Sequence, residues 1–134
     1  MTVFVTAQAQ LIVGEAQVIE SLAPEGPCAA VFEDDGETGY FYALIENAEG
    51  NPIQDALHIY NADDVSDGKI PSDVKIGWSE DNKKCVLLIN GYPHGVFNFD
   101  TKNGYCRTGF PPAGNEVWSL FGHDWTDDVD DFFR

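Results

Sequence analysis

The sequence predicts an α+β fold, mostly an antiparallel β meander of about six to eight strands with a C-terminal helix. Three observations predict it. Turn residues such as Gly, Pro, Asn and Asp recur at short intervals, short apolar runs lie between them, and helical spacing of apolar residues occurs only near the C-terminus. With 134 residues, 43% of them hydrophobic, we expect a single domain over residues 1–134 with its own core.

The clearest hairpin lies in the N-terminal half. Two apolar runs, residues 29–32 and 40–45, flank an acidic turn at residues 33–39 whose glycines can adopt positive φ. Residues 57–60 then read as a short strand. The loop 61–71 ends that strand.

The C-terminal half continues the meander. The turns at residues 79–82, 90–95 and 100–104 separate four apolar runs, which are residues 74–78, 85–89, 96–99 and 105–107. Residues 85–89 are continuously apolar, so we expect a central strand covered on both faces. The pair Pro111-Pro112 forbids continuation of the last strand.

The last segment has helical periodicity. Thr126 is placed to cap a helix whose first turn holds Asp127 and Asp128, and Gly122 is a point at which the segment could divide. One predicted helical stripe comprises Trp118, Phe121, Trp125, Val129 and Phe132.

The charge balance excludes several classes of partner. Twenty-three acidic residues face seven basic ones, for a net charge of −16. Such a surface repels nucleic acid and anionic membranes and attracts basic proteins. Residues 1–10 contain no Lys or Arg and no long apolar run, so we expect neither a secretory signal nor an anchor. We expect a cytoplasmic monomer or weak dimer whose three cysteines are reduced.

No pattern predicts a metal site, a cofactor or a catalytic residue. Loop 61–68 is acidic, but Val65 and Val74 stand where a calcium-binding loop needs oxygen ligands. The three histidines have no partner at metal-ligand spacing. Cys106 and His94 are the only conceivable thiol–imidazole pair, and so acidic a chain disfavours a thiolate.

Arg107 stands apart as the only arginine besides the terminal one. One interpretation is an internal ion pair that fixes a strand or turn. The other is an anion site formed by Tyr92, His94 and Arg107 near the loop 108–112, because a guanidinium offers a rigid fork to an anion.

The densest charge lies in the predicted helix. Its aspartates can form a solvated face or, together with an aromatic residue, a docking surface for a basic partner. The predicted docking residues are Asp124, Trp125, Asp127, Asp128, Asp130 and Asp131.

Four segments carry a resemblance to a known family: FEDDGETGYFYAL (32–44), DALHIYN (55–61), LLINGYPHGVFNF (87–99) and GYCRTGFPP (104–112). Together they span most of residues 28–112. The chain resembles small bacterial proteins grouped as a domain of unknown function. The resemblance implies a bacterial, single-domain protein and carries over no activity and no catalytic residue.

The sequence favours a binding protein over an enzyme. Our hypothesis is an immunity-like or antitoxin-like protein that covers a basic protein partner. The alternative is a small enzyme or ligand-binding domain with an anion site around His94 and Arg107. A third interpretation is that the acidity serves only solubility.

Salt is expected to stabilise the fold. Because carboxylates greatly outnumber basic groups, like-charge repulsion dominates, and ions screen it over about 8–10 Å near physiological ionic strength. Melting temperature measured across a sodium chloride series should therefore rise from low to moderate salt. A flat or falling series would mean that favourable ion pairs outweigh the repulsion.

Overall fold

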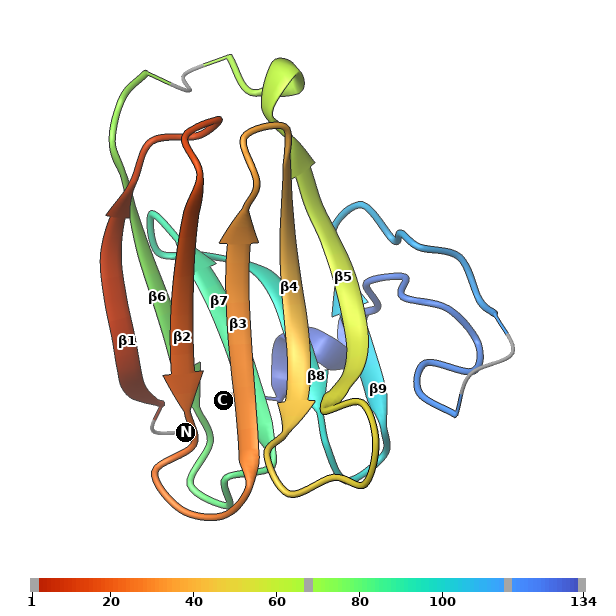
Figure 1. Cartoon of the computed structure of the whole chain (residues 1–134). Helices are drawn as coiled ribbons and strands as arrows, with labels where there is room; N and C mark the ends of the chain where they lie inside the picture. The colour runs from red at the N-terminus through yellow and green to blue at the C-terminus, as the bar shows by residue number, and fades with distance from the viewer. Residues whose placement is uncertain (1–2, 67–68, 115–116, 133–134) are drawn as a thin grey trace.

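Two antiparallel sheets pack face to face in this computed structural model, which describes residues 3–66, 69–114 and 117–132 (Figure 1). The prediction of mostly antiparallel β-structure is confirmed. The described residues form nine strands in two sheets, more than the six to eight expected, and almost no helix, so the expected α+β class is wrong. The five-stranded sheet has the order β1 (Phe4–Leu11), β6 (Ser72–Trp78), β7 (Lys84–Ile89), β8 (Tyr92–Asn98) and β9 (Asn103–Cys106). The four-stranded sheet has the order β2 (Gln17–Leu22), β3 (Cys28–Asp34), β4 (Thr38–Ile45) and β5 (Ile53–Asn61).

Each sheet contains one meander, and the first strand links them. Strands β2 to β5 follow one another in one sheet, and β6 to β9 do so in the other. Strand β1 pairs with β6 in the five-stranded sheet, while the next strand, β2, starts the four-stranded one. A short 3-10 helix, η1 (Ala62–Asp64), follows β5 on the way back to the other sheet. No described helix is long and apolar enough to span a membrane.

The main core lies between the sheets. Phe32, Phe41 and Leu57 from one sheet and Trp78 and Phe97 from the other are fully buried. Burial of one such side chain stabilises the fold by about 1.5–3 kcal/mol. The indole of Trp78 also carries a hydrogen-bond donor, which needs a partner when it is buried. Trp78 Nε1 donates to Ser21 Oγ on β2 over 2.9 Å.

The sheets approach each other closely at Gly95 on β8. A Cβ atom there would lie 3.2 Å from both Ile59 Cδ1 and Phe41 Cδ2, side chains of the opposite sheet. A larger residue would therefore push the sheets apart at this point. This close packing brings β8 and β9 against β5.

The edge of β5 is covered by the segment that follows β9. His58 N donates to Phe110 O over 2.9 Å, and Thr108 Oγ1 donates to His58 O over 2.6 Å. This flank of the sandwich is thereby closed by one main-chain hydrogen bond and one from a side chain.

The prediction of a C-terminal helix is wrong. Only a 3-10 helix, η2 (Asp127–Asp131), occurs in the described part of the tail. Ser119 and Gly122 adopt φ values of 52° and 99°, which break any continuous helix at these residues. The apolar stripe is also divided, because Trp118 packs in the core between the sheets whereas Val129 packs on the opposite face of the five-stranded sheet. The tail therefore passes round the β9 edge and serves two separate apolar clusters.

Candidate functional site

Arg107 lies at the centre of a cluster at the β9 edge. Its guanidinium carbon is 3.7 Å from the centre of the Trp125 ring and 4.8 Å from that of Tyr92. Its Nε donates to Pro93 O over 3.1 Å, and its Nη2 lies 3.9 Å from Asp130 Oδ1. Trp125 Nε1 donates to the same carboxylate oxygen over 3.2 Å. Aromatic faces and an internal carboxylate thus hold the guanidinium.

This cluster joins two sets of residues that the sequence analysis kept apart. Tyr92 and Arg107 were expected at an anion site, and Trp125 and Asp130 at a docking surface, yet the four lie together. An anion approaching Arg107 would have to compete with Asp130. The arrangement corresponds to the internal ion pair considered for Arg107 and fastens the tail to β8 and β9.

The His94 ring packs against Tyr92 of this cluster, but its side chain lines a separate pocket. The two ring centres are 5.4 Å apart, and Arg107 N donates to His94 O over 3.3 Å. Burial and then the positive charge of Arg107 lower the pKa of His94. The His94 side chain lines a pocket of about 290 Å³ whose lining includes Ile59 and Tyr60 but not Arg107.

Cys106 is a buried neutral thiol. Its Sγ donates to Phe110 O over 3.4 Å, and burial raises its pKa. The thiol is therefore poorly suited to act as a nucleophile at neutral pH.

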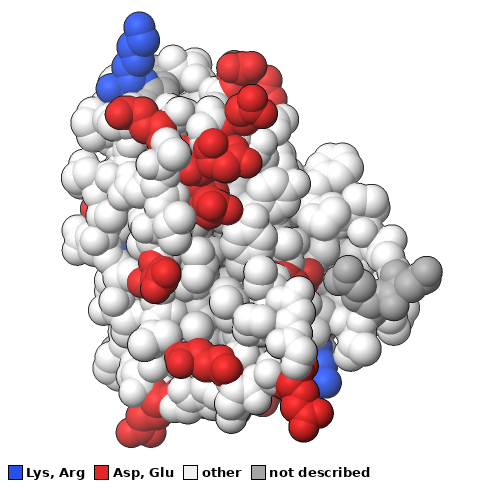
Figure 2. All heavy atoms as spheres, viewed as in Figure 1, with Lys and Arg blue, Asp and Glu red and all other residues white. Residues whose placement is uncertain are grey.

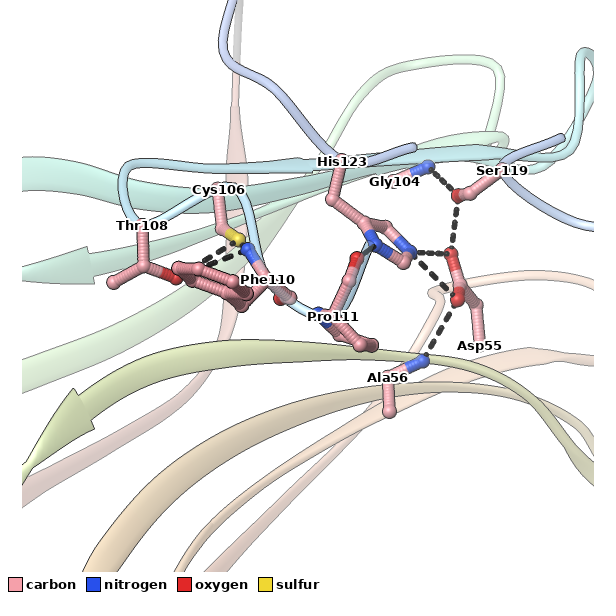
Figure 3. A network of polar contacts seen from close by, with 9 residues as sticks. All are labelled: Asp55, Ala56, Gly104, Cys106, Thr108, Phe110, Pro111, Ser119 and His123. Atoms are coloured by element: carbon pink, nitrogen blue, oxygen red, sulfur yellow. Dashed lines mark hydrogen bonds and ion pairs between the residues drawn. The ribbon is translucent and has the colours of Figure 1, made fainter. Parts of the chain in front are cut away.

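A buried polar network lies between β5 and the tail, as Figure 3 shows. Asp55 Oδ2 accepts from Ser119 Oγ over 2.5 Å, and Asp55 Oδ1 accepts from Ala56 N over 2.9 Å. The Nε2 atom of His123 lies 2.9 and 3.1 Å from the two carboxylate oxygens. Asp55, Ser119 and His123 are all at most 5% exposed. This carboxylate therefore joins β5 to the part of the tail that holds Ser119 and His123.

Hydrogen-bond chemistry fixes where the protons of this network lie. His123 Nδ1 faces Pro111 O at 2.5 Å, and because a carbonyl only accepts, Nδ1 carries a proton. Nε2 faces carboxylate oxygens, so a proton also lies between the ring and Asp55. Ser119 Oγ accepts from Gly104 N over 2.8 Å, which directs its own proton to Asp55.

The residue types are those of a catalytic triad, but the connections differ. In a triad the serine donates to the histidine, whereas Ser119 donates to Asp55. The serine is also buried, with 2% of its surface exposed. The network is therefore an anchor that fastens Pro111, Ser119 and His123 to β5. Sequence reasoning missed it because Asp55 and its partners lie more than sixty positions apart.

The tail aspartates are not collected on one helix face. Asp124, Asp127, Asp128 and Asp131 are exposed, while Trp125 is half-buried against Arg107. The main chain at Cys106 and Asp124 forms a parallel bridge, and Cys106 N donates to His123 O over 3.0 Å. Within the described residues, no three His, Cys, Asp or Glu side chains are grouped as a metal site.

Charge is distributed unequally between the two sheets. All seven basic residues stand at Lys69 or later, so β2 to β5 contain no basic side chain. Figure 2 shows the outer side of this sheet, where carboxylates surround a largely uncharged area and basic groups appear only at the margins. The sequence already indicates this unequal distribution, because its first basic residue is Lys69. The net charge alone does not reveal it.

Replacing Arg107 with Ala should lower the free energy of unfolding by about 1–3 kcal/mol. The loss comes from the two aromatic contacts and one hydrogen bond, because a half-exposed ion pair contributes little. The variant should also raise the pKa of His94 towards its ordinary value, since the repelling charge is gone. Urea denaturation and NMR titration of the histidine measure the two effects.

Arg107→Lys is the matched control for this pair of effects. It keeps the positive charge, so His94 should titrate as in the wild type while stability still falls. His94 binds fewer protons when folded than unfolded, so its contribution to stability should decline as pH falls below about 6.5. An unchanged titration in Arg107→Ala would contradict the assignment of Arg107 as the neighbouring charge.

Replacing His123 with Ala should destabilise the fold by about 3–5 kcal/mol, because the buried Asp55 carboxyl group loses the buried partner with which it shares a proton. His58→Ala is the matched control. It removes a half-buried histidine that contacts Thr108 and Asn61, so we expect a loss of about 1 kcal/mol. Urea denaturation compares them. Equal losses in the two variants would show that the Asp55 network is not the principal anchor of the tail.

Comparison with known proteins adds a family. A protein of Haemophilus influenzae (strain ATCC 51907 / DSM 11121 / KW20 / Rd), named "Uncharacterized protein", is 48% identical over 92 residues, which cover 68% of this chain and 57% of that relative. The match thus spans just over half of the relative's length. No solved structure matches the chain. A family model described as "Uncharacterized protein conserved in bacteria (DUF2251)" matches residues 11–134. The chain therefore belongs to this bacterial family, in agreement with the resemblance carried by its sequence segments.

Proposed function

We propose that this chain is a binding protein whose partner is a basic protein. The observation that carries the proposal is the segregation of charge. One complete sheet, β2 to β5, has acidic side chains and no basic ones, whereas every basic residue lies in the second half of the chain. A surface that carries only negative charges attracts cations over distances up to about a Debye length.

The physical consequence is steered association. A basic surface approaching the β2–β5 side meets no repelling group from this sheet, and its association rate should depend strongly on salt. The exposed tail aspartates Asp127, Asp128 and Asp131 add negative charge at a second place. A toxin whose basic surface is covered by an immunity-like protein is one partner with this chemistry.

The alternative, an anion site around His94 and Arg107, has less support. The guanidinium is already engaged by Trp125, Tyr92 and Asp130. The pocket beside it, about 160 Å³, is mostly apolar and contains Asp130 as its charged side chain, which would repel an anion. Binding of a basic protein therefore accounts for more of the surface than anion binding does.

A pull-down from the source cell's lysate, at low and at high salt, tests the proposal with three proteins. The wild type is compared with a sheet variant, in which Glu20 on β2 and Glu37 and Glu46 in the turns beside β4 are each replaced by Gln. The third protein is a tail variant, Asp127→Asn, Asp128→Asn and Asp131→Asn. Both variants remove three exposed carboxylates. Asp130 is left unchanged because it holds Arg107 and Trp125.

The expected result is that the wild type recovers a specific basic protein at low salt and that the sheet variant recovers much less of it. The tail variant then reports whether the aspartates contribute to docking. Recovery that is the same for all three proteins at every salt concentration would refute an electrostatic partner-binding role. Circular dichroism of each variant provides the control for folding.

A further inference from the structure

The outer face of the β2–β5 sheet is more apolar than the solvated face of an antiparallel sheet usually is. Such a face normally alternates apolar residues inside with polar residues outside. Here Val18 and Leu22 on β2 are 54% and 58% exposed, and Ile53 on β5 is 44% exposed. No described segment crosses in front of this face in Figure 1. The opposite outer face, on the five-stranded sheet, is covered by the tail through Val129.

The strand register places these side chains next to one another. Val31 lies opposite both Glu20 and Tyr42, and Leu44 lies opposite Ala29 and Ile53. Cross-strand neighbours of this kind have Cβ atoms about 4.5–5.5 Å apart. Together they form a shallow groove of about 270 Å³ lined by Val18, Val31, Glu33, Tyr42, Leu44 and Ile53.

Two carboxylates are set within this apolar face. Glu20 pairs with Val31, and Glu33 lies two residues further along β3, so the two residues are diagonal neighbours, with Cα atoms about 7–8 Å apart. Like charges on such neighbours repel, and the sheet offers no basic side chain to compensate them. Burial and the charge of Glu33 also raise the pKa of Tyr42, so its hydroxyl stays protonated beside the acid. A cation placed between the two carboxylates would relieve this repulsion.

We propose that this outer face, defined by the six groove residues with Glu20 and Leu22, docks a segment of a basic protein that presents aliphatic and cationic side chains on the same side. The inference rests on the proposed function and names its site and its partner chemistry. The aliphatic groups cover Val18, Val31 and Ile53, and a Lys or Arg lies between Glu20 and Glu33. A second copy of this chain is disfavoured as the occupant, because each copy carries a net charge of −16 and the same carboxylates.

Defined peptides test the inference. The probe is an extended peptide of repeating Val-Ser-Lys-Ser, in which alternate positions place Val and Lys on one side of a strand. One control replaces Val with Ser and keeps the charge; the other replaces Lys with Glu and keeps the apolar groups. Binding is followed by NMR of the Val, Leu and Ile methyl groups at low salt, with the protein concentration also varied in the absence of peptide.

We expect the Val-Ser-Lys-Ser peptide to shift the methyl signals of Val18, Val31, Leu44 and Ile53, and the control peptides to bind at least about tenfold more weakly, which corresponds to about 1.4 kcal/mol. The variant Val18→Ser, Leu22→Ser should lose about tenfold in affinity for the probe, as should Glu20→Gln, Glu33→Gln. Val117→Ser, Leu120→Ser is the matched control, because it removes two exposed apolar side chains from the distant loop and should bind as the wild type does.

Four results would overturn the inference. Equal binding of the Ser-for-Val peptide would mean that charge alone acts. Methyl shifts confined to other parts of the molecule, or no shift at all, would place the partner elsewhere. Methyl shifts at this face that depend only on protein concentration would identify a second copy as the occupant. If the lysate experiment recovers a basic partner equally with wild type and Val18→Ser, Leu22→Ser, the proposed function stands and this docking face is rejected.

Discussion

The C-terminal third of this structure depends on the buried carboxylate of Asp55. A carboxyl group removed from water is costly unless it is hydrogen-bonded. Asp55 obtains hydrogen-bond partners from residues distant in sequence, Ser119 and His123. Because a donor to one carboxylate must come from a fixed direction, the tail has few alternative paths. The same network requires Gly at 104, where a Cβ atom would stand 2.8 Å from Asp55 Oδ2.

The Asp55 network and the Arg107 cluster each hold a different part of the tail in place. The Asp55 network fixes the part that lies against the inner side of the sandwich, where Trp118 joins the main core. The Arg107 cluster fixes the part beyond the sheet edge, where Trp125 and Val129 reach the outer side. The tail thereby covers part of the outer face of the five-stranded sheet, whereas no described segment covers the outer face of the β2–β5 sheet. The difference between the two outer faces is the structural basis for the binding role that we propose.

Sequence reasoning found the strands that lie between clear turn signals and missed the strands that lack such signals. The runs at residues 29–32 and 85–89 stand between clear turn signals, and both lie in strands β3 and β7. Strands β1 and β2 were not predicted, because Gln, Thr, Ala and Glu dilute their apolar pattern and long-range pairing alone makes them strands. The prediction of a helix in the tail failed because its apolar residues have helical spacing but pack in two clusters on different sides of a sheet. Asp55 could not be found, because no local pattern links it to Ser119 or His123. The charge segregation could have been found from the position of Lys69 alone.

The hydrogen bonds between His58 and the segment at Phe110 also bear on whether strands of two molecules can pair at this edge. A free strand edge is a template for pairing with another chain, and nature protects such edges with coverage, bulges or charge. The β5 edge is occupied by the chain's own main chain at Phe110, and the β1 edge is interrupted by an irregularity between Val5 and Ala7. Edge-to-edge addition is thus obstructed at β5 and disturbed at β1. The sheet that carries the open outer face is therefore not free to extend from its β5 edge.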